Sequence, residues 1–216
     1  MAAPLTKVAL TVGFSGLAGS SCFGVWKALT RSSIISIKEK VLASYKNDFS
    51  KFLSLEDTNW DAIQAEYEKS ESSHKPIENG KLVTKEELPS WCAKAIDSPF
   101  DEKDTITLNV VLRWCYLNTN SFDQQAQELN KVLHGDKTGG EAASWQNAWE
   151  NVYKVYKDQE QWKISDGESN LNLDDKTNGG KSLQSWCSSK SSVTMFSHEA
   201  KVTFPKFEKF CLKNRS

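Results

Sequence analysis

Cysteine is the residue type in this 216-residue chain whose spacing most directly implies chemistry. Apart from Cys22, four cysteines remain, and they fall into the pairs Cys92 with Cys115 and Cys187 with Cys211. A disulfide in each pair would close a loop of about 23 residues and add roughly 3 kcal/mol of stability by loop entropy. Disulfides would also imply an oxidising, extracellular environment. Four cysteines allow three connectivities, and buried free thiols that pack as small hydrophobic groups are the alternative.

The histidines and cysteines lack the spacing of a metal site. His74, His134 and His198 lie far apart in the sequence, and no two cysteines have the CxxC spacing of a structural zinc site. We therefore predict no metal site, and we expect the histidines to be solvent-exposed or to lie at the ends of helices.

The segment around Asn178-Gly-Gly-Lys181-Ser182 ends like a phosphate-binding loop, but Asp175 stands where that loop needs its first glycine. The same segment resembles a calcium loop, yet Lys176 occupies a ligand position and Ser185 replaces the bidentate glutamate. We interpret it as a turn before a serine-capped helix. The sequence thus predicts no cofactor and no catalytic residues, and the chain is not expected to be an enzyme.

Composition excludes a further class of function. The formal net charge of −1 gives no excess of lysine and arginine for binding nucleic acid. Eight tryptophans and ten phenylalanines supply enough apolar area for a packed core.

A repeated motif organises the chain. Residues 88–92 read Leu-Pro-Ser-Trp-Cys, and residues 183–187 read Leu-Gln-Ser-Trp-Cys. Each copy also has a tryptophan seven residues before a tyrosine, and an aromatic residue directly before its last cysteine. We therefore predict a first copy with a linker helix at 31–118 and a second copy at 119–216, and this arrangement favours disulfides within each copy. The expected repeat core is Trp60, Tyr67, Trp91, Trp114, Trp149, Tyr156, Trp186 and Phe210.

The elements that must position these residues are predicted to be mostly α-helical. Apolar residues at helical spacing indicate helices over 60–67, 88–95, 122–133 and 145–156, and before Cys115 and Cys211. Thr84 and Glu87 could form a capping box, Pro205 suits a first turn, and His134-Gly135 suits a helix end. A linker helix is expected over about 34–52.

Residues 1–30 are expected to hold a transmembrane or signal-anchor segment. The run Val8–Trp26 contains no charged residue, and as a helix its nineteen residues would span roughly 28 Å, close to the thickness of a bilayer core. Gly16, Ser20 and Gly24 form a stripe that could let two helices approach closely.

Other interpretations of the N-terminal segment stay open. It could be a cleavable signal peptide with a site near Ala18-Gly19-Ser20, a lipoprotein signal with Cys22 as the lipidated residue, or a buried part of the folded domain. The positive-inside rule would place the folded domain in the cytoplasm, because Lys27, Arg31, Lys38 and Lys40 follow the segment. Disulfides would place it outside.

Taken together, these features resemble the paralogous uncharacterised membrane-associated proteins of haemotropic mycoplasmas. The shared features are the start Met-x-x-Pro-Leu-x-Lys, a glycine-rich apolar helix, a Trp-x(6)-Tyr helix and paired cysteines that follow aromatic residues. The chain departs from the usual proline- and threonine-containing tail at Tyr116–Thr119 and at Cys211–Ser216. The resemblance implies a surface-exposed protein of an erythrocyte-attached parasite, with a role in antigenic diversity, and it implies no catalytic residues.

The resulting functional hypothesis is a single-pass membrane protein with an extracellular domain that acts as a binding or antigenic module. Its expected partners are the lipid bilayer, through Val8–Trp26, and a host surface or a second copy of itself, but not nucleic acid. The alternatives are a self-associating membrane scaffold, and an enzyme or regulator with an unrecognised site.

Overall fold

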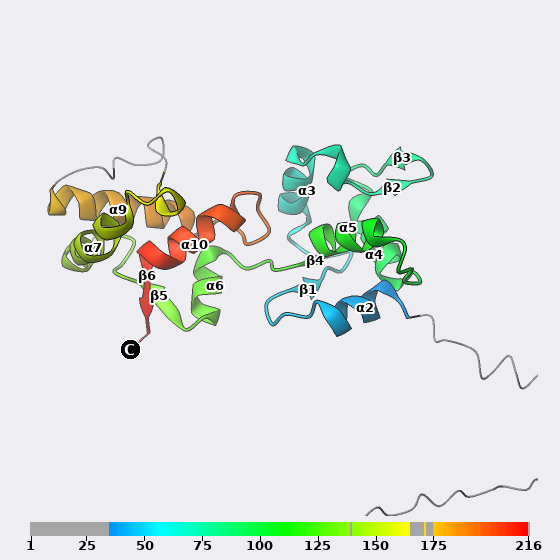
Figure 1. The fold of residues 1–216 in the computed structure, drawn as a ribbon, viewed down its shortest axis with the longest axis horizontal. Coiled ribbons are helices and arrows are strands. Elements are labelled where there is room, and N and C mark those ends of the chain that lie inside the picture. The colour runs from blue at the N-terminus through cyan, green and yellow to red at the C-terminus, as the bar shows by residue number, and fades with distance from the viewer. Residues whose placement is uncertain (1–34, 139, 165–170, 172–174, 216) are drawn as a thin grey trace, which may run out of the picture. The chain divides into compact units, whose positions relative to one another are not determined.

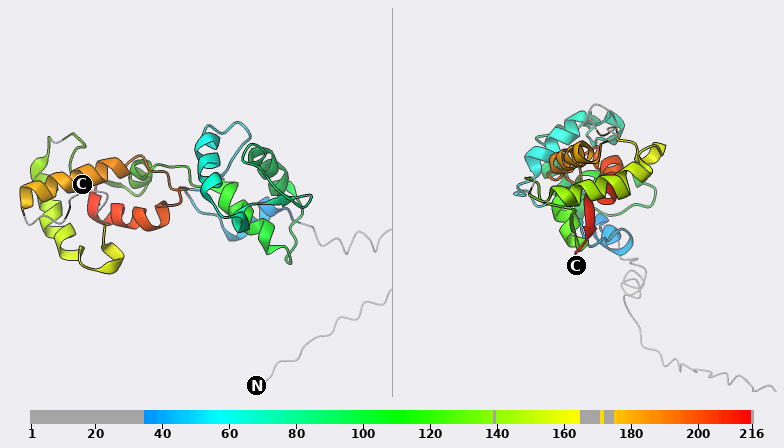
Figure 2. Two further views of the ribbon diagram at one scale, coloured as in Figure 1. Left: turned by 90° about the horizontal axis from the view of Figure 1, so that it is seen from above. Right: turned by 90° about the vertical axis from the view of Figure 1, so that its left-hand side faces the viewer.

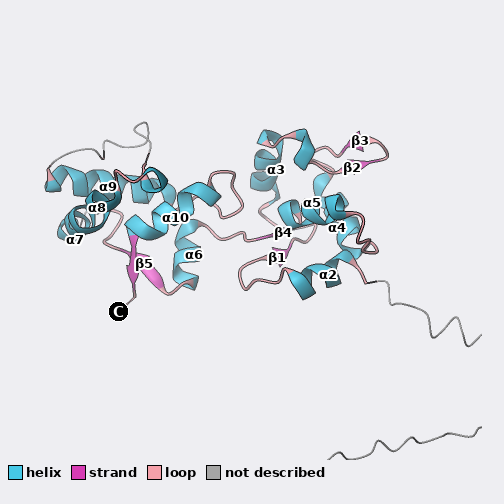
Figure 3. Cartoon of the chain, viewed as in Figure 1, coloured by secondary structure: helices cyan, strands magenta, loops and turns pink. Residues whose placement is uncertain are grey.

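The computed structural model describes residues 35–138, 140–164, 171 and 175–215, and within them the fold is mostly helical with short strands (Figures 1 and 3). Contacts group residues 35–216 into one compact unit that contains two hydrophobic cores. The predicted anchor, Val8–Trp26, lies outside the described residues. Among the residues that are described, no helix has the length and apolar character needed to cross a membrane.

The first core lies within residues 35–118, which we call the first half. An antiparallel pair, β1 with β4, joins its beginning to its end, and β2 with β3 forms a hairpin. Its elements in chain order are α2 (Ile37–Ser44), β1 (Lys51–Phe52), α3 (Trp60–Lys69), a 3-10 turn (Ser72–His74), β2 (Ile77–Glu78), β3 (Lys81–Leu82), α4 (Leu88–Asp97), α5 (Thr105–Trp114) and β4 (Tyr116–Leu117).

The second core lies within residues 119–215, the second half. Here α7 packs against α9 and α9 against α10, as Figure 2 shows from two directions, and β5 pairs with β6 antiparallel. Its elements are α6 (Phe122–Glu128), β5 (Lys131–Leu133), α7 (Ala142–Ala148), a π-helix (Trp149–Tyr153), α8 (Lys154–Tyr156), a 3-10 turn (Glu160–Trp162), α9 (Lys176–Lys190), α10 (Ala200–Cys211) and β6 (Leu212–Asn214).

Capping boxes begin the first helix of each half. The Ser36 hydroxyl accepts the Glu39 N–H, and the Glu39 carboxylate accepts the Ser36 N–H in return. Ser121 and Gln124 make the same reciprocal bonds before α6. Each pair satisfies amide groups that a helix start leaves without a partner inside the helix.

The capping box predicted from Thr84 and Glu87 is present, since each residue accepts the other's backbone N–H. The regular helix α4 begins only at Leu88, and Pro89 stands in its first turn, where a missing N–H costs no hydrogen bond.

Two predicted helices are shorter than expected. The linker helix expected over 34–52 ends at Ser44, because the Asn47 side chain accepts the N–H groups of Phe49 and Ser50 and turns the chain into β1. The helix expected over 122–133 ends at Glu128, well before Gly135. Asn130 adopts a left-handed φ of 55°, which asparagine tolerates better than most residues, and the chain continues as β5.

Two helix starts also differ from expectation. Helix α9 begins at Lys176 and is capped by Asp175 rather than by a serine, because the Asp175 carboxylate accepts the N–H groups of Thr177 and Asn178. Helix α10 begins at Ala200, so Pro205 lies inside the helix and not in its first turn. The helix tolerates this proline while burying Phe207 and Phe210 in the second core.

Candidate functional site

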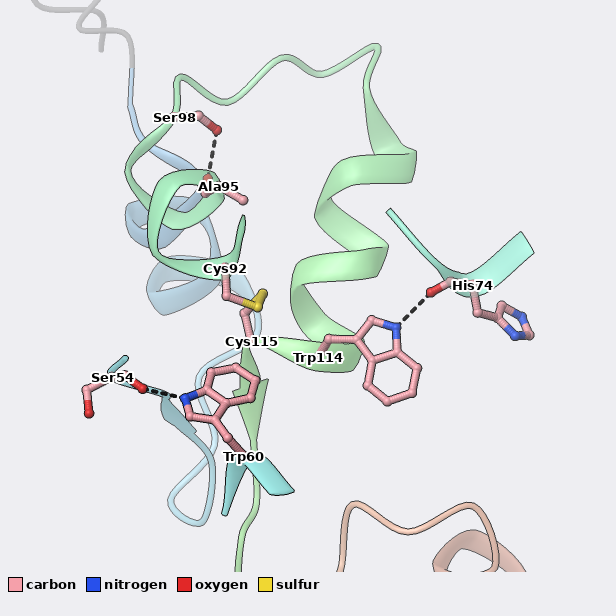
Figure 4. The surroundings of a disulfide bond; sticks show 8 residues. All are labelled: Ser54, Trp60, His74, Cys92, Ala95, Ser98, Trp114 and Cys115. Carbon is pink, nitrogen blue, oxygen red and sulfur yellow. Dashed lines mark hydrogen bonds between the residues drawn. A yellow bond between two sulfur atoms is a disulfide. The ribbon is translucent and has the colours of Figure 1, made fainter. Parts of the chain in front are cut away.

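Two disulfides link the last two long helices of each half. Cys92 lies on α4, Cys115 directly follows α5, and their bond has a Cα–Cα distance of 5.4 Å (Figure 4). Cys187 on α9 bonds Cys211 at the end of α10, with a Cα–Cα distance of 5.6 Å. All four cysteines are at most 1% exposed, so each disulfide is part of a core. This is the connectivity that the repeated motif favours.

Aromatic residues surround the first disulfide (Figure 4). The indole N–H of Trp114 donates to the His74 carbonyl at 2.7 Å, and that of Trp60 donates to the Ser54 carbonyl at 2.7 Å. Tyr67 meets the Trp114 ring edge to face at 5.0 Å between centroids. The rings therefore bury apolar area while their polar atoms remain satisfied.

The second half has a comparable aromatic contact around its disulfide. Tyr153 meets Phe210 edge to face at 5.1 Å, and the indole N–H of Trp145 donates to the Asp136 carbonyl at 2.8 Å. Six of the eight predicted core residues are buried in the two halves: Trp60, Tyr67, Trp114, Trp149, Trp186 and Phe210.

The other two predicted core residues, Trp91 and Tyr156, are only partly buried. For Tyr156 the reason is the π-helix, whose wider turn rotates the following residues relative to an α-helix. Tyr153 therefore fills the buried position, at 2% exposure. Tyr156 lies at the margin of the core, where the Lys209 ammonium sits 3.5 Å from the centre of its ring. The helical spacing of residues 145–156 places both tyrosines on the apolar face, but the repeated motif selected Tyr156 for the core, and the structure buries Tyr153 instead.

His134 is neither exposed nor at the end of a helix, contrary to expectation, but follows β5 and is partly buried. Its Nε2 is buried and has no hydrogen-bond partner among the described residues, and its ring lies 6.3 Å from that of Trp145. Burial, together with the charge of Lys213, lowers the pKa of His134. His198 is exposed, and His74 is partly buried.

The segment that resembles a phosphate-binding or calcium loop forms the first two turns of α9. Gly179 and Gly180 face the core there, and Lys181 is exposed. The described residues contain no group of three or more His, Cys, Asp or Glu side chains that could hold a metal ion.

Tyr67 gives a testable feature of the first core. Its hydroxyl donates to the Val83 carbonyl at 2.6 Å, and burial raises the pKa of Tyr67 to about 12. We expect Tyr67→Phe to lower the free energy of unfolding by about 1–2 kcal/mol at pH 7, because the buried carbonyl loses its donor. Urea unfolding measures this loss, and Tyr45→Phe at an exposed position is the control.

The pKa of Tyr67 also predicts a pH dependence. A tyrosine in the unfolded chain ionises near pH 10, so the contribution of Tyr67 to stability is complete below that pH. It should be lost between about pH 10 and pH 12, as the unfolded chain releases a proton that the folded chain retains. The difference in stability between the wild type and Tyr67→Phe should therefore shrink over this range. A difference that stays constant would contradict the assignment.

The arrangement described here is structural, because its cysteines are joined in buried disulfides and its aromatic rings fill the cores. It offers rigidity and an exposed surface. No family model, no curated protein and no solved structure matches this chain.

Proposed function

We propose that this chain is a membrane-anchored, surface-exposed binding or antigenic module rather than an enzyme. The observation that carries the proposal is the presence of two buried disulfides. Such bonds persist in oxidising environments and are rare where thioredoxin and glutathione keep thiols reduced. They therefore favour an extracellular location of the folded domain over the cytoplasmic location that the positive-inside rule suggests.

The proposal includes a duplication of one small helical unit. Apart from the β2–β3 hairpin and the short 3-10, π and α8 segments, both halves have the order helix, strand, helix, helix, helix, strand. In each half the first strand pairs with the last. An isolated bridge joins each capping serine to the loop before the last helix, as Ser36 to Pro99 and as Ser121 to Thr194. A disulfide then joins the last two helices of each unit. These shared features support an origin of both halves from one ancestral unit.

The anchor of the proposed module is Val8–Trp26, whose uncharged run reaches the length that spans a bilayer. A stable domain held at a surface through its N-terminus suits the presentation of an epitope or the capture of a partner. Variation in exposed loops can then change recognition without altering the disulfide-linked cores.

Protease treatment of intact cells that express the chain tests this location. We expect the folded domain to be digested from outside, with a cytosolic protein in the same cells left intact as the control. Because the disulfides themselves resist digestion, the protease should act on loops, and loss of an epitope tag placed at the C-terminus is the readout. Protection of the tag in intact cells, together with its digestion after lysis, would overturn the proposal.

A further inference from the structure

A cavity of about 290 Å³ lies between α3, the end of α5 and the segment that precedes α10. Its apolar lining includes Trp114, which is buried, and Phe196, which comes from the second half and packs against the first core. Phe196 is only partly buried and supplies the exposed apolar wall, while the Arg113 guanidinium lies 5.3 Å from the centre of the Trp114 ring.

Two cations line the same cavity. Arg113 at the end of α5 and Lys201 in the first turn of α10 both contribute to its walls. Neither forms an ion pair with a carboxylate among the residues that the structure describes. Their charges are therefore available to a bound molecule.

The carboxylate in the lining, that of Glu66, is already engaged. One of its oxygens accepts the Lys69 ammonium at 2.7 Å, and the other accepts the His198 backbone N–H at 2.8 Å. Burial raises the pKa of Glu66, but the two hydrogen bonds and the charges of Lys69 and His198 together outweigh it, so the pKa is lowered. Glu66 thus holds the segment before α10 in place, while Arg113 and Lys201 leave the cavity with an excess of positive charge.

A third donor is present at Ser197. Its hydroxyl oxygen is buried and has no hydrogen-bond partner among the described residues, although Ser197 itself lines the cavity. A buried hydroxyl without a partner costs free energy that a ligand oxygen could recover. Helix α10 begins nearby at Ala200, and the positive end of its dipole makes the electrostatic potential more favourable for an anion.

We propose that this cavity binds a small organic anion. An oxyanion, either a carboxylate or a phosphate monoester, would lie against Arg113, Lys201 and the Ser197 hydroxyl, and its apolar body would lie against Phe196. This inference names the class of molecule that the proposed binding module would bind. Its biological role rests on the proposed function, but binding in the cavity does not depend on where the domain is located. Protease treatment tests where the domain lies, and ligand titration tests the cavity, so either can fail without the other.

Calorimetric titration of the purified full-length chain in a neutral detergent tests the site with three probes of similar size. Phenyl phosphate and benzoate carry the two candidate oxyanions on one aromatic ring, and benzyl alcohol carries no charge. We expect at least one of the two anions to bind and benzyl alcohol to bind at least about tenfold more weakly, because a hydrogen bond to a charged group contributes more than a neutral one.

Variants then locate the site. Arg113→Gln and Lys201→Gln should each weaken binding of the anion about tenfold. Ser197→Ala should weaken it several-fold while leaving the melting temperature unchanged or raised, since a purely structural role for this hydroxyl would lower that temperature. Lys81→Gln, on the exposed β2–β3 hairpin, removes the same charge elsewhere and should leave the affinity unchanged.

Three results would overturn the proposal: neither anion binds, benzyl alcohol binds as tightly as the anions, or Lys81→Gln weakens binding as much as Arg113→Gln does. The last result would mean that overall charge, and not this cavity, attracts the anion.

Discussion

Replacing Cys187 and Cys211 together by alanine is expected to lower the free energy of unfolding by about 3 kcal/mol. The bond between them closes a loop with a sequence separation of 24 residues, so its loss increases the conformational entropy of the unfolded chain. Both sulfur atoms are fully buried, and their removal also leaves a small cavity in the second core. Urea unfolding of the variant and the wild type under non-reducing conditions measures the difference.

The corresponding change of Cys92 and Cys115, whose sequence separation is 23 residues, should give a loss of similar size in the first half. A reductant should destabilise the wild type but have no effect on a variant that lacks all four of these cysteines, which controls for effects of the reagent. A loss below about 1 kcal/mol for both double variants would contradict a stabilising role of the disulfides.

The second large effect is expected at Gly179. A Cβ atom placed on this glycine would lie 2.2 Å from Cε2 of the Trp149 ring, a distance that no real side chain accepts. Trp149 is fully buried, so its ring cannot move aside without disturbing the packing of α9 on the π-helix. We expect Gly179→Ala to lower the free energy of unfolding by at least about 2 kcal/mol through overpacking.

The direction of the change in stability is informative, because intrinsic helix propensity alone predicts that Gly179→Ala would stabilise the helix. Alanine is favoured over glycine in a helix by about 1 kcal/mol when nothing else changes. Lys181→Ala, on the exposed side of the same helix, is the matched control and should change stability little. If Gly179→Ala proved neutral or stabilising by thermal unfolding, the close contact with Trp149 would be absent in solution.

The sequence predicted the helical class and the positions of the cysteine pairs because both depend on local patterns. Periodic apolar residues define the faces of α4 and α5, and the repeated Ser-Trp-Cys motif places Cys92 and Cys187 on corresponding helices. The reciprocal bonds of Thr84 and Glu87 were also predictable, since a capping box needs residues only three positions apart.

Features that depend on tertiary packing could not be predicted in this way. The π-helix at Trp149–Tyr153 adds one residue to a helix whose apolar spacing also fits a regular α-helix. The end of α6 is set by Asn130, a residue type that occurs in helices as well as at their ends. Gly179 and Gly180 looked like a turn, because their use for close helix packing is visible only beside Trp149 and Gln146.

The candidate anion site could not be predicted from the sequence either, because it too depends on tertiary packing. Arg113 and Lys201 are 88 positions apart in the sequence, and neither belongs to a motif that indicates binding. Ser197 is an ordinary loop serine until the structure shows that its hydroxyl is buried and that no described residue pairs with it.

The two disulfides also determine how the domain would respond to a pulling force between a tether at its N-terminal end and a partner bound near its C-terminus. Tension along the chain passes through the Cys92–Cys115 and Cys187–Cys211 bonds and not through the residues that lie between each pair. Those residues cannot lengthen the chain even after their helices unfold, which removes about 150 Å from the extension that force can release. A pulling force would therefore extend this protein by roughly a fifth less than an uncrosslinked chain of the same length.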